Sequence, residues 1–370
     1  MHFSIVAILL VSIAVTGLLM PMLIKLFSLK RLVDNTERRK IHDREIPTMG
    51  GTGFFAAFMI TLLLFGSYEQ LAAHRVEILT ISVMFVVGLR DDLIELRPVS
   101  KLIAQLVPAF LLIYLSNLVF LSFNNFLGIG DIPYWFGVTL SLLTIIGLTN
   151  SFNLIDGLDG LACSLALLGS LVFGSWFYYQ GVDYYSFIAF AFAGSLIGFL
   201  YYNWQPAKIF MGDTGALVIG FLLAILAIRF IEYNAMLPAG TFLKFNSGIT
   251  LAISILIVPI FDTLRIIIVR LILKRSPFVP DKNHTHHMLL RLGFSHAQST
   301  LILVFVNIAF IGLAFSLDFL GDNMLMPIII SLAVSLSFVL NYFVRKRLAS
   351  RNFDAKGTRL EVIKSHRKAS

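Results

Sequence analysis

Apolar stretches separated by short polar segments run along the chain from its start to about position 343. A helix needs about 20 consecutive apolar residues to cross the hydrocarbon core of a bilayer. By that measure the pattern predicts eleven membrane-spanning helices, the third and fifth of them short, at 3–24, 49–66, 76–89, 102–120, 134–149, 161–180, 186–202, 214–231, 248–268, 299–317 and 324–343. We therefore expect an all-α, polytopic integral membrane protein.

The composition supports this fold class. Hydrophobic residues make up 58% of the 370 positions and charged residues only 14%, and the mean hydropathy is +0.86. Because a soluble domain is roughly half apolar and about a quarter charged, a water-soluble fold is excluded. The single cysteine, Cys163, also excludes an internal disulfide and a cysteine-based zinc cage.

The basic residues are divided unequally between alternate loops. With eleven spans, one side of the membrane receives 26 of the 29 Lys and Arg residues, and only Arg75, Arg229 and Lys244 fall on the other side. Since positive loops are cytoplasmic, the N-terminus is predicted outside and the C-terminus in the cytoplasm. We expect one transmembrane domain at 1–343 and a basic cytoplasmic tail at 344–370. The tail would lie near anionic headgroups, so the partners are membrane lipids and not nucleic acid.

Two pairs of aspartates lie on the predicted cytoplasmic side. Asp91 and Asp92 end an apolar segment and are followed by Lys101. Adjacent carboxylates there are costly unless they are solvated, paired or bound to a metal, and oxygen ligands beside basic groups suit Mg²⁺ and phosphate. Asp156 and Asp159, in NSFNLIDGLDG, are spaced to share one face of a helical turn, between glycines that allow a ligand to approach the backbone. A solvated turn and simple loop capping are the alternatives.

The third and fourth clusters add a lone aspartate and three histidines. Asp213, in FMGDTG, opens an apolar segment, where it is expected to hold a cation or to cap a helix. The fourth cluster begins at Asp262 and Arg265 and ends in the sequence NHTHH. Zinc sites in proteins use other histidine spacings with a cysteine or carboxylate partner. Imidazole donors around a pyrophosphate, beside Arg and Lys, explain this cluster better, and a solvated loop is the remaining alternative.

Together these clusters place carboxylates for Mg²⁺ and basic groups for phosphate on one membrane face, as phosphoryl transfer requires. The strings that carry them closely resemble the polyprenyl-phosphate N-acetylhexosamine-1-phosphate transferases, over about residues 35–295. These strings are RRKIHDREIPTMGG, GLRDDLIELRPVSKLIAQ, TNSFNLIDGLDGLA, NWQPAKIFMGDTGAL and PIFDTLRIIIVRLILKRSPFVPDKNHTHHMLLRLG. The eleven-helix topology with an outside N-terminus resembles the same family.

The resemblance implies a reaction and a location. The phosphate of undecaprenyl phosphate would attack the β-phosphorus of UDP-GlcNAc, releasing UMP and forming undecaprenyl-diphospho-GlcNAc. This is the first lipid-linked step of surface glycans such as O-antigen, common antigen or teichoic acid linkage units. The implied cofactor is Mg²⁺, for which Mn²⁺ substitutes. The implied location is the bacterial cytoplasmic (inner) membrane, with the active site in cytoplasmic loops.

The resemblance also implies residue roles. Asp91, Asp92 and Asp213 would be catalytic, with Asp213 and Asp92 as metal ligands and the Asp91–Asp92 pair beside the lipid phosphate. The other implied site residues contact substrate or support those that do. They are Asn153, Asp156 and Asp159 on the nucleotide side, Phe210 stacked on uracil, Arg265, His284, His286 and His287 around the sugar and pyrophosphate, and the polar partners Lys101, Asn203 and Arg44.

Several alternatives stay open. The alternative donors are another UDP-N-acetylhexosamine and a UDP-muramoyl-pentapeptide. The transferases that use the second of these have a different sequence in the histidine loop. A secondary transporter is disfavoured, because transporters place carboxylates and paired broken helices near the bilayer midplane. A phosphate monoester has a second pKa of about 6 and is mostly dianionic at pH 7, so we expect Asp91 to orient the nucleophile in a direct in-line transfer. A covalent aspartyl intermediate is the alternative. The sequence does not determine the oligomeric state, and a homodimer is one option.

Overall fold

The computed structural model describes residues 4–30, 32, 46–274 and 284–368, and within this part the chain is almost entirely helical. The one strand pair found there is a hairpin of β1 (Ser122–Phe126) and β2 (Ile129–Asp131). The helices are α1 (Ile5–Leu29), α2 (Gly51–Phe65), α3 (Tyr68–Ala73), α4 (Arg75–Leu93), α5 (Pro98–Ser116), α6 (Tyr134–Ile155), α7 (Leu161–Tyr179), α8 (Asp183–Asn203), α9 (Gly212–Met236), α10 (Gly248–Ile255), α11 (Ile257–Ile272), α12 (Thr285–Arg291), α13 (His296–Ser316) and α14 (Gly321–Lys368), with a short 3₁₀ turn at Asp318–Leu320.

Eight helices in the described ranges are long and apolar enough to cross a membrane, which confirms a multi-pass membrane protein. They are α1, α5, α6, α7, α8, α9, α13 and the first part of α14. The α10–α11 pair would be a ninth span if it is counted as one. Each of the eleven predicted segments contains a helix, but α2 has only 15 residues and α4 carries charges at both ends. The count of eleven spans and the orientation of the termini therefore stay predictions.

The segment predicted as one span at 248–268 is instead two helices, α10 and α11, bent by 85°. Pro259 lacks an N–H and cannot donate to the carbonyl of Ile255 one turn earlier. The side chain of Asn307 in α13 bonds to two backbone groups at the bend, a carbonyl and an N–H. Its Nδ2 donates to Ile255 O at 2.9 Å, and its Oδ1 accepts from Val258 N at 3.3 Å. The bend brings α11 toward α12.

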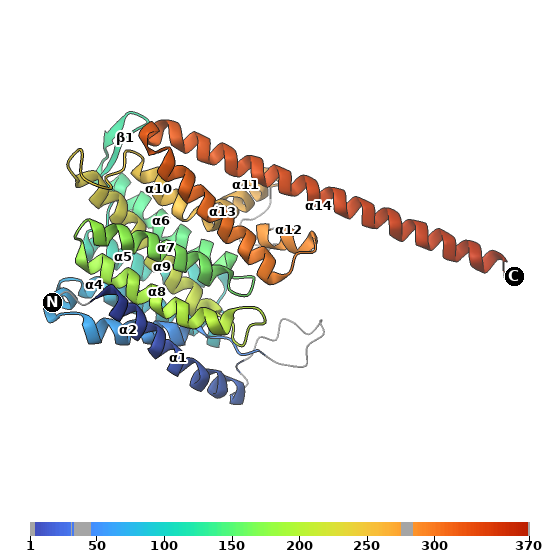
Figure 1. Cartoon of the computed structure of the whole chain (residues 1–370), viewed down its shortest axis with the longest axis horizontal. Helices are drawn as coiled ribbons and strands as arrows, with labels where there is room; N and C mark the ends of the chain where they lie inside the picture. The colour runs from blue at the N-terminus through green and yellow to red at the C-terminus, as the bar shows by residue number, and fades with distance from the viewer. Residues whose placement is uncertain (1–3, 31, 33–45, 275–283, 369–370) are drawn as a thin grey trace.

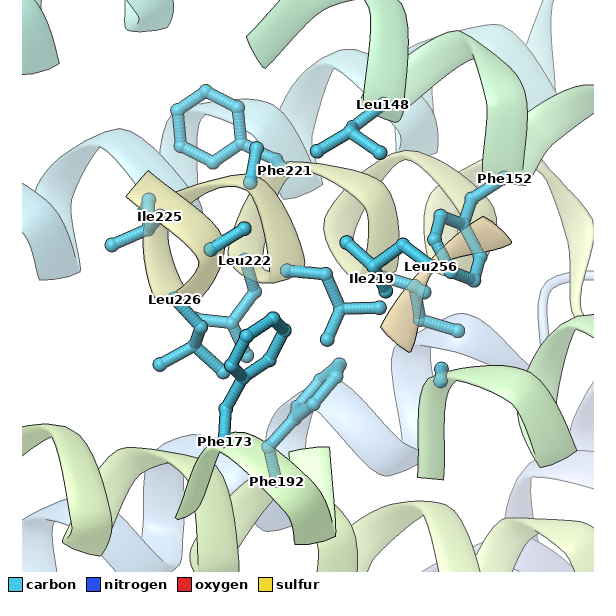
Figure 2. Close-up of a cluster of buried hydrophobic side chains, with 14 of the residues drawn as sticks. Leu148, Phe152, Phe173, Phe192, Ile219, Phe221, Leu222, Ile225, Leu226 and Leu256 are labelled. Atoms are coloured by element: carbon cyan, nitrogen blue, oxygen red, sulfur yellow. The ribbon is translucent and has the colours of Figure 1, made fainter. Parts of the chain in front are cut away.

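Helix α9 lies at the centre of the bundle, in contact with α2, α4, α6, α7 and α10. Eighteen of its 25 residues are buried, including every residue from Thr214 to Ile228. Figure 2 shows Ile219 and Leu222 of α9 packed among Phe173 of α7 and Phe192 of α8. Lipid tails are as apolar as these side chains, so close van der Waals packing has to hold such helices together.

Glycines bring α2, α4 and α9 together at one end of the bundle. A Cβ on Gly51 would lie 2.2 Å from Gly215 N, and one on Gly88 would lie 2.6 Å from Thr214 Cα. Backbone of three helices therefore meets at the start of α9. Asp91 and Asp92 follow Gly88 by about one helical turn, so this packing places them beside Asp213.

A buried ion-pair cluster joins α4 and α9 at the opposite ends of these two helices. Glu77 of α4 accepts hydrogen bonds from Arg229 of α9 at 3.2 Å and from Tyr185 of α8 at 2.7 Å. Arg229 also donates to Glu232 and to Ser116 O. Arg229 lies sixteen residues after Asp213, which is about 24 Å along an α-helix. The charges of Glu77 and Arg229 are thus paired far from the aspartates.

Helix α14 continues without interruption through position 343, where the sequence predicts the end of the membrane domain. Figure 1 shows it extending well beyond the rest of the bundle. A charged segment can continue a helix because its side chains need only water or headgroups around them. The division between a domain at 1–343 and a tail at 344–370 is not marked by a helix end and stays a prediction.

Candidate active site

Lys101 is the centre of a polar cluster at one end of the bundle. Its Nζ lies 2.8 Å from Asp91 Oδ2 and 2.9 Å from Asp213 Oδ1, and it donates to Asn153 Oδ1 at 3.1 Å. Asn153 Nδ2 in turn donates to Asp213 Oδ1. Helices α4, α5, α6 and α9 each supply one of these residues. The sequence predicts all four as site residues, and the fold brings the other three into contact with the Lys101 ammonium group.

Asp92 binds the start of α9. Its Oδ1 accepts from Asp213 N at 2.7 Å, and its Oδ2 accepts from Thr214 N at 2.9 Å and from the Thr214 hydroxyl. Gly212 is in the left-handed region at φ 74°, and a Cβ there would lie 2.6 Å from Asp92 Oδ2. A carboxylate at a helix N-terminus is stabilised by the helix dipole. Asp92 is therefore a cap donated by a neighbouring helix, with both oxygens engaged.

Asp156 lies just after α6 and faces the other carboxylates. Burial, together with the negative charges of Asp213 and Asp92, raises the pKa of Asp156 to about 8. Within the described residues its carboxylate receives no hydrogen bond that would offset this repulsion. Such a group is stabilised by a proton or by a cation.

The donor set fits Mg²⁺ better than zinc. In the part of the chain that the structure describes, no three histidine, cysteine or acidic side chains are placed to hold one metal ion. Mg²⁺ is usually bound by about one or two carboxylates, with substrate phosphates and water completing its octahedron. The Asp213 carboxylate contacts Lys101 and Asn153 through Oδ1 alone, and the Asp156 carboxylate accepts no hydrogen bond from the described residues. These two carboxylates therefore have oxygens that could bind Mg²⁺. Asp92, whose oxygens are occupied by N–H and O–H donors, matches it less well than the sequence suggested.

The histidine cluster is organised by Asp262 of α11. Its carboxylate lies 2.8 Å from His284 Nδ1 and 3.0 Å from the Arg265 guanidinium. Thr285 donates its N–H at 2.8 Å and its hydroxyl to the same group. The sequence marks Asp262 as the start of the fourth cluster but does not predict it to be a site residue. The available signal was an acidic residue inside an apolar segment.

His286 connects α12 to the turn that carries Asp156. Its ring lies on the backbone of Gly157, where a Cβ would be 2.4 Å from Nε2. The ring is nearly parallel to that of His284, with centroids 5.5 Å apart, and its centroid is 4.3 Å from that of His287. Burial, and then the neighbouring His287, lowers the pKa of His286 to about 3. His286 is thus a neutral, buried ring that joins the two halves of the site.

Asn203 and Asp159 are engaged with the backbone. Asn203 is buried, accepts from Gly160 N and donates to Ile209 O, both at 3.0 Å. Asp159 accepts from Ala207 N at 3.3 Å and lies 3.4 Å from His296 Nδ1. These bonds hold the 156–160 turn against the 204–209 loop. A contact of either side chain with a nucleotide stays a prediction.

Phe210 is half-buried, and backbone bonds to the segment before α2 fix its position. Its N–H donates to Pro47 O at 2.9 Å, and its carbonyl accepts from Gly50 N at 2.8 Å. Its stacking on uracil stays a prediction. Arg44 lies outside the described residues.

An apolar cavity of about 190 Å³ lies between α11, α12, α13 and α14. Thr285, which is bonded to Asp262, forms part of its wall, and Leu289, Phe310 and Ala333 line it further along. The cavity therefore begins beside the histidine cluster.

Comparison with known proteins identifies the family. The model for glycosyl transferase family 4 matches residues 75–231, which include Asp91, Asp156 and Asp213. A probable undecaprenyl-phosphate N-acetylglucosaminyl 1-phosphate transferase of Bacillus subtilis is 33% identical over 304 residues, covering 80% of each chain. The chain belongs to this family. It is a membrane-embedded polyprenyl-phosphate sugar-phosphate transferase, and its acceptor is a polyprenyl phosphate.

Two further relatives match this transferase over different shares of its chain. The undecaprenyl-phosphate alpha-N-acetylglucosaminyl 1-phosphate transferase of Thermotoga maritima is 28% identical over 80% of this chain and 86% of its own. The phospho-N-acetylmuramoyl-pentapeptide-transferase of Listeria monocytogenes is 34% identical, but over only 57% of this chain and 69% of its own. The similarity to the first kind of transferase thus extends over more of the chain.

Proposed function

We propose that this transferase moves N-acetylglucosamine 1-phosphate from UDP-GlcNAc to undecaprenyl phosphate and releases UMP. The observation that carries the proposal is the convergence of Asp91, Asp213 and Asn153 on Lys101, beside Asp156 and the histidine cluster. This arrangement offers carboxylates for a divalent cation and basic groups for phosphates within one small site. The relatives matched over most of the chain are named for this transfer.

Mg²⁺, or Mn²⁺ in its place, is proposed to bind Asp213 and Asp156. When bound, it would screen the phosphate charges and polarise the β-phosphoryl group. Asp92 would act through α9, because its bonds to Asp213 N and Thr214 N fix the start of that helix. Lys101 would keep Asp213 ionised and correctly oriented.

The transfer itself would be a direct in-line displacement. An oxygen of the acceptor phosphate forms a bond to the β-phosphorus, the bond from that phosphorus to the bridging oxygen breaks, and UMP leaves with the bridging oxygen. The acceptor is already mostly dianionic above a pH of about 6, so Asp91 and Lys101 would orient it without removing a proton. Arg265, His284 and His287 would bind the pyrophosphate, and Phe210 would stack on uracil.

The apolar cavity is proposed to take the first prenyl units of the acceptor. Its wall contains Thr285, so a lipid chain lying in it would emerge beside the histidine cluster. A prenyl chain gains nothing from polar contacts, and an almost wholly apolar lining suits it. The lipid phosphate would then reach the site from the membrane.

The site is proposed to face the cytoplasm, where UDP-sugars are made, in the inner membrane of a bacterium. Most Lys and Arg residues fall on that side in the predicted topology. The product would start surface glycans such as O-antigen, common antigen or a teichoic acid linkage unit.

The test is an assay of the purified full-length protein with undecaprenyl phosphate and a panel of radiolabelled donors. We expect UDP-GlcNAc to have the highest kcat/KM and UMP to be the released nucleotide. The shorter match to the Listeria transferase makes UDP-muramoyl-pentapeptide the second candidate donor, with other UDP-N-acetylhexosamines beside it. Preference for one of these would overturn the donor assignment, and release of UDP would overturn the reaction.

A further inference from the structure

A buried aspartate of α11, Asp262, ties the bent helix pair to the histidine helix α12. It is 2% exposed. Its Oδ2 lies 2.8 Å from His284 Nδ1, while its Oδ1 accepts from Thr285 N at 2.8 Å and lies 3.0 Å from Arg265. An ionised carboxylate has no proton to donate, so each of these hydrogen bonds runs toward Asp262. The oxygens are occupied by the chain's own donors, which leaves Asp262 no means of binding substrate directly.

The bond to Asp262 decides which nitrogen of His284 is protonated. With Nδ1–H donating to the carboxylate, Nε2 is the nitrogen that remains for another partner. The nearby carboxylate also compensates the positive charge of the ring when Nε2 carries a proton. The parallel ring of His286, with its centroid 5.5 Å away, restrains His284 from the side. The orientation of His284 is therefore fixed before any substrate arrives.

The same carboxylate holds the first residue of α12. Thr285 is bonded to it through both its N–H and its hydroxyl. One residue further on, His286 lies on Gly157, next to Asp156. A shift of Thr285 would therefore move both histidines relative to the carboxylates of the site.

We propose that Asp262 is a positioning residue of the transferase, which holds His284 with its Nε2 turned to a phosphate oxygen of the donor pyrophosphate. This rests on the proposed function, because it requires a UDP-sugar in the site. Asp262→Asn would reverse the hydrogen bond: the amide donates to Nδ1, and the proton of the neutral ring moves to Nε2. The ring would then lose the carboxylate that stabilises its charged form.

The chain offers a matched control at the other end of the bundle. Asp322, at the start of α14, accepts from Thr250 N at 2.7 Å and from the Thr250 hydroxyl at 2.6 Å, as Asp262 does from Thr285. It is also buried, at 8% exposure, but has no histidine partner among the bonds that the structure describes. Asp322→Asn removes a charge from the same kind of threonine contact without touching the site.

The test compares Asp262→Asn, His284→Gln, the double variant and Asp322→Asn in the purified full-length enzyme. We expect Asp262→Asn and His284→Gln each to lower kcat about 10- to 100-fold, as for the loss of one charge-assisted hydrogen bond. The KM for UDP-GlcNAc should change by less than about threefold in Asp262→Asn, because the ring still occupies its place. The double variant should fall within about threefold of His284→Gln, since residues that act as a unit are not additive. Asp322→Asn should keep kcat within about threefold of the wild type.

A spectroscopic measurement keeps the proposal separate from the proposed function. In ¹⁵N-histidine spectra of the substrate-free protein, assigned by the signal that His284→Gln removes, Nδ1 of His284 should be protonated, and Asp262→Asn should move the proton to Nε2. An unprotonated Nδ1 in the wild type would overturn the positioning role, as would independent, multiplicative losses in the double variant. An equal loss of kcat in Asp322→Asn would reduce Asp262 to a structural cap. Failure of the wild type to release UMP with any of the donors would instead overturn the proposed function, whatever the spectra show.

Discussion

Lys101 places one positive charge between two carboxylates that approach each other from different helices. Without that charge, Asp91 and Asp213 would repel each other across the start of α9. The Lys101 side chain is mostly buried, so its attraction for these carboxylates is screened less than at an open surface. A single residue thus determines both the charge balance and the geometry of the candidate site.

We predict that Lys101→Met lowers turnover by about 100- to 1,000-fold, because the electrostatic support of Asp213 and of the acceptor phosphate is lost together. Lys101→Arg keeps the charge and should retain more activity than Lys101→Met. Turnover of both variants is measured with the radiolabel assay, and thermal unfolding shows whether each is folded. Wild-type turnover in a folded Lys101→Met protein would contradict a central role for this residue.

Asp156 and Asp92 are predicted to differ in their effect on the metal. Asp156→Asn should raise the Mg²⁺ concentration needed for half-maximal activity at least about tenfold, because a ligand oxygen is removed. Asp92→Asn should change that concentration less than about threefold but lower the unfolding temperature, because the cap of α9 is weakened. Activity as a function of Mg²⁺ and thermal unfolding of both variants separate these effects. The reverse pattern would make Asp92 the metal ligand and Asp156 the structural group.

For single residues, the sequence predicts which side chains belong to the site better than it predicts which groups they contact. Asp91, Lys101, Asn153 and Asp213 were predicted for the site, and the fold places them in contact. A sequence pattern contains no distances, so it cannot tell a helix cap from a metal ligand. The structure shows that Asp92 caps α9, and its role as a metal ligand stays a prediction. The central place of Asp262 does not follow from the sequence, because its partner His284 lies 22 residues further along the chain and only the tertiary structure brings the two together.

At the scale of elements, hydropathy predicts where the helices lie but not whether a helix is straight or bent. An apolar run has the same composition whether the helix is straight or bent, so 248–268 was expected to be one span. The bend depends on Pro259 together with a donor from α13, Asn307, which only the tertiary structure brings to Ile255. The β1–β2 hairpin was not predicted, because it contains too few residues to register beside the long apolar runs.

The cavity bounded by α11 to α14 gives a prediction at the scale of elements. Ala333→Phe should raise the KM for undecaprenyl phosphate at least about tenfold, because the added ring fills volume that the lipid would occupy. The KM for UDP-GlcNAc should change less than about twofold, since the donor binds outside the membrane. Leu332→Phe, on the adjacent exposed position of α14, is the matched control and should leave both constants unchanged. An unchanged acceptor KM in a folded Ala333→Phe protein would mean that the prenyl chain lies elsewhere.

For the whole molecule, the polar residues divide into two groups at opposite ends of the bundle. The carboxylates around Lys101 lie where α4 ends and α5 begins, and the Glu77–Arg229 pair lies at the other ends of α4 and α9. The β1–β2 hairpin follows α5, so it belongs to the end opposite Lys101, where Leu127 N donates to Asn323 of α14. A transferase whose donor is a UDP-sugar needs the first of these ends in the cytoplasm.

We therefore predict that a reporter fused after Ser370 is cytoplasmic and that one inserted after Gly128, at the tip of the hairpin, is outside. The physical reason is the distribution of charge: 26 of the 29 Lys and Arg residues fall on the side predicted to be cytoplasmic, and positive loops resist translocation. Paired alkaline phosphatase and green fluorescent protein fusions at both positions measure this, because each reporter is active on one side only. The Gly128 insertion is the internal control, since opposite results at the two positions show that the fusions have not disturbed insertion. If both results were inverted, Lys101 and its aspartates would face away from the cytoplasmic pool of UDP-sugars, and the proposed donor would have no access to the site.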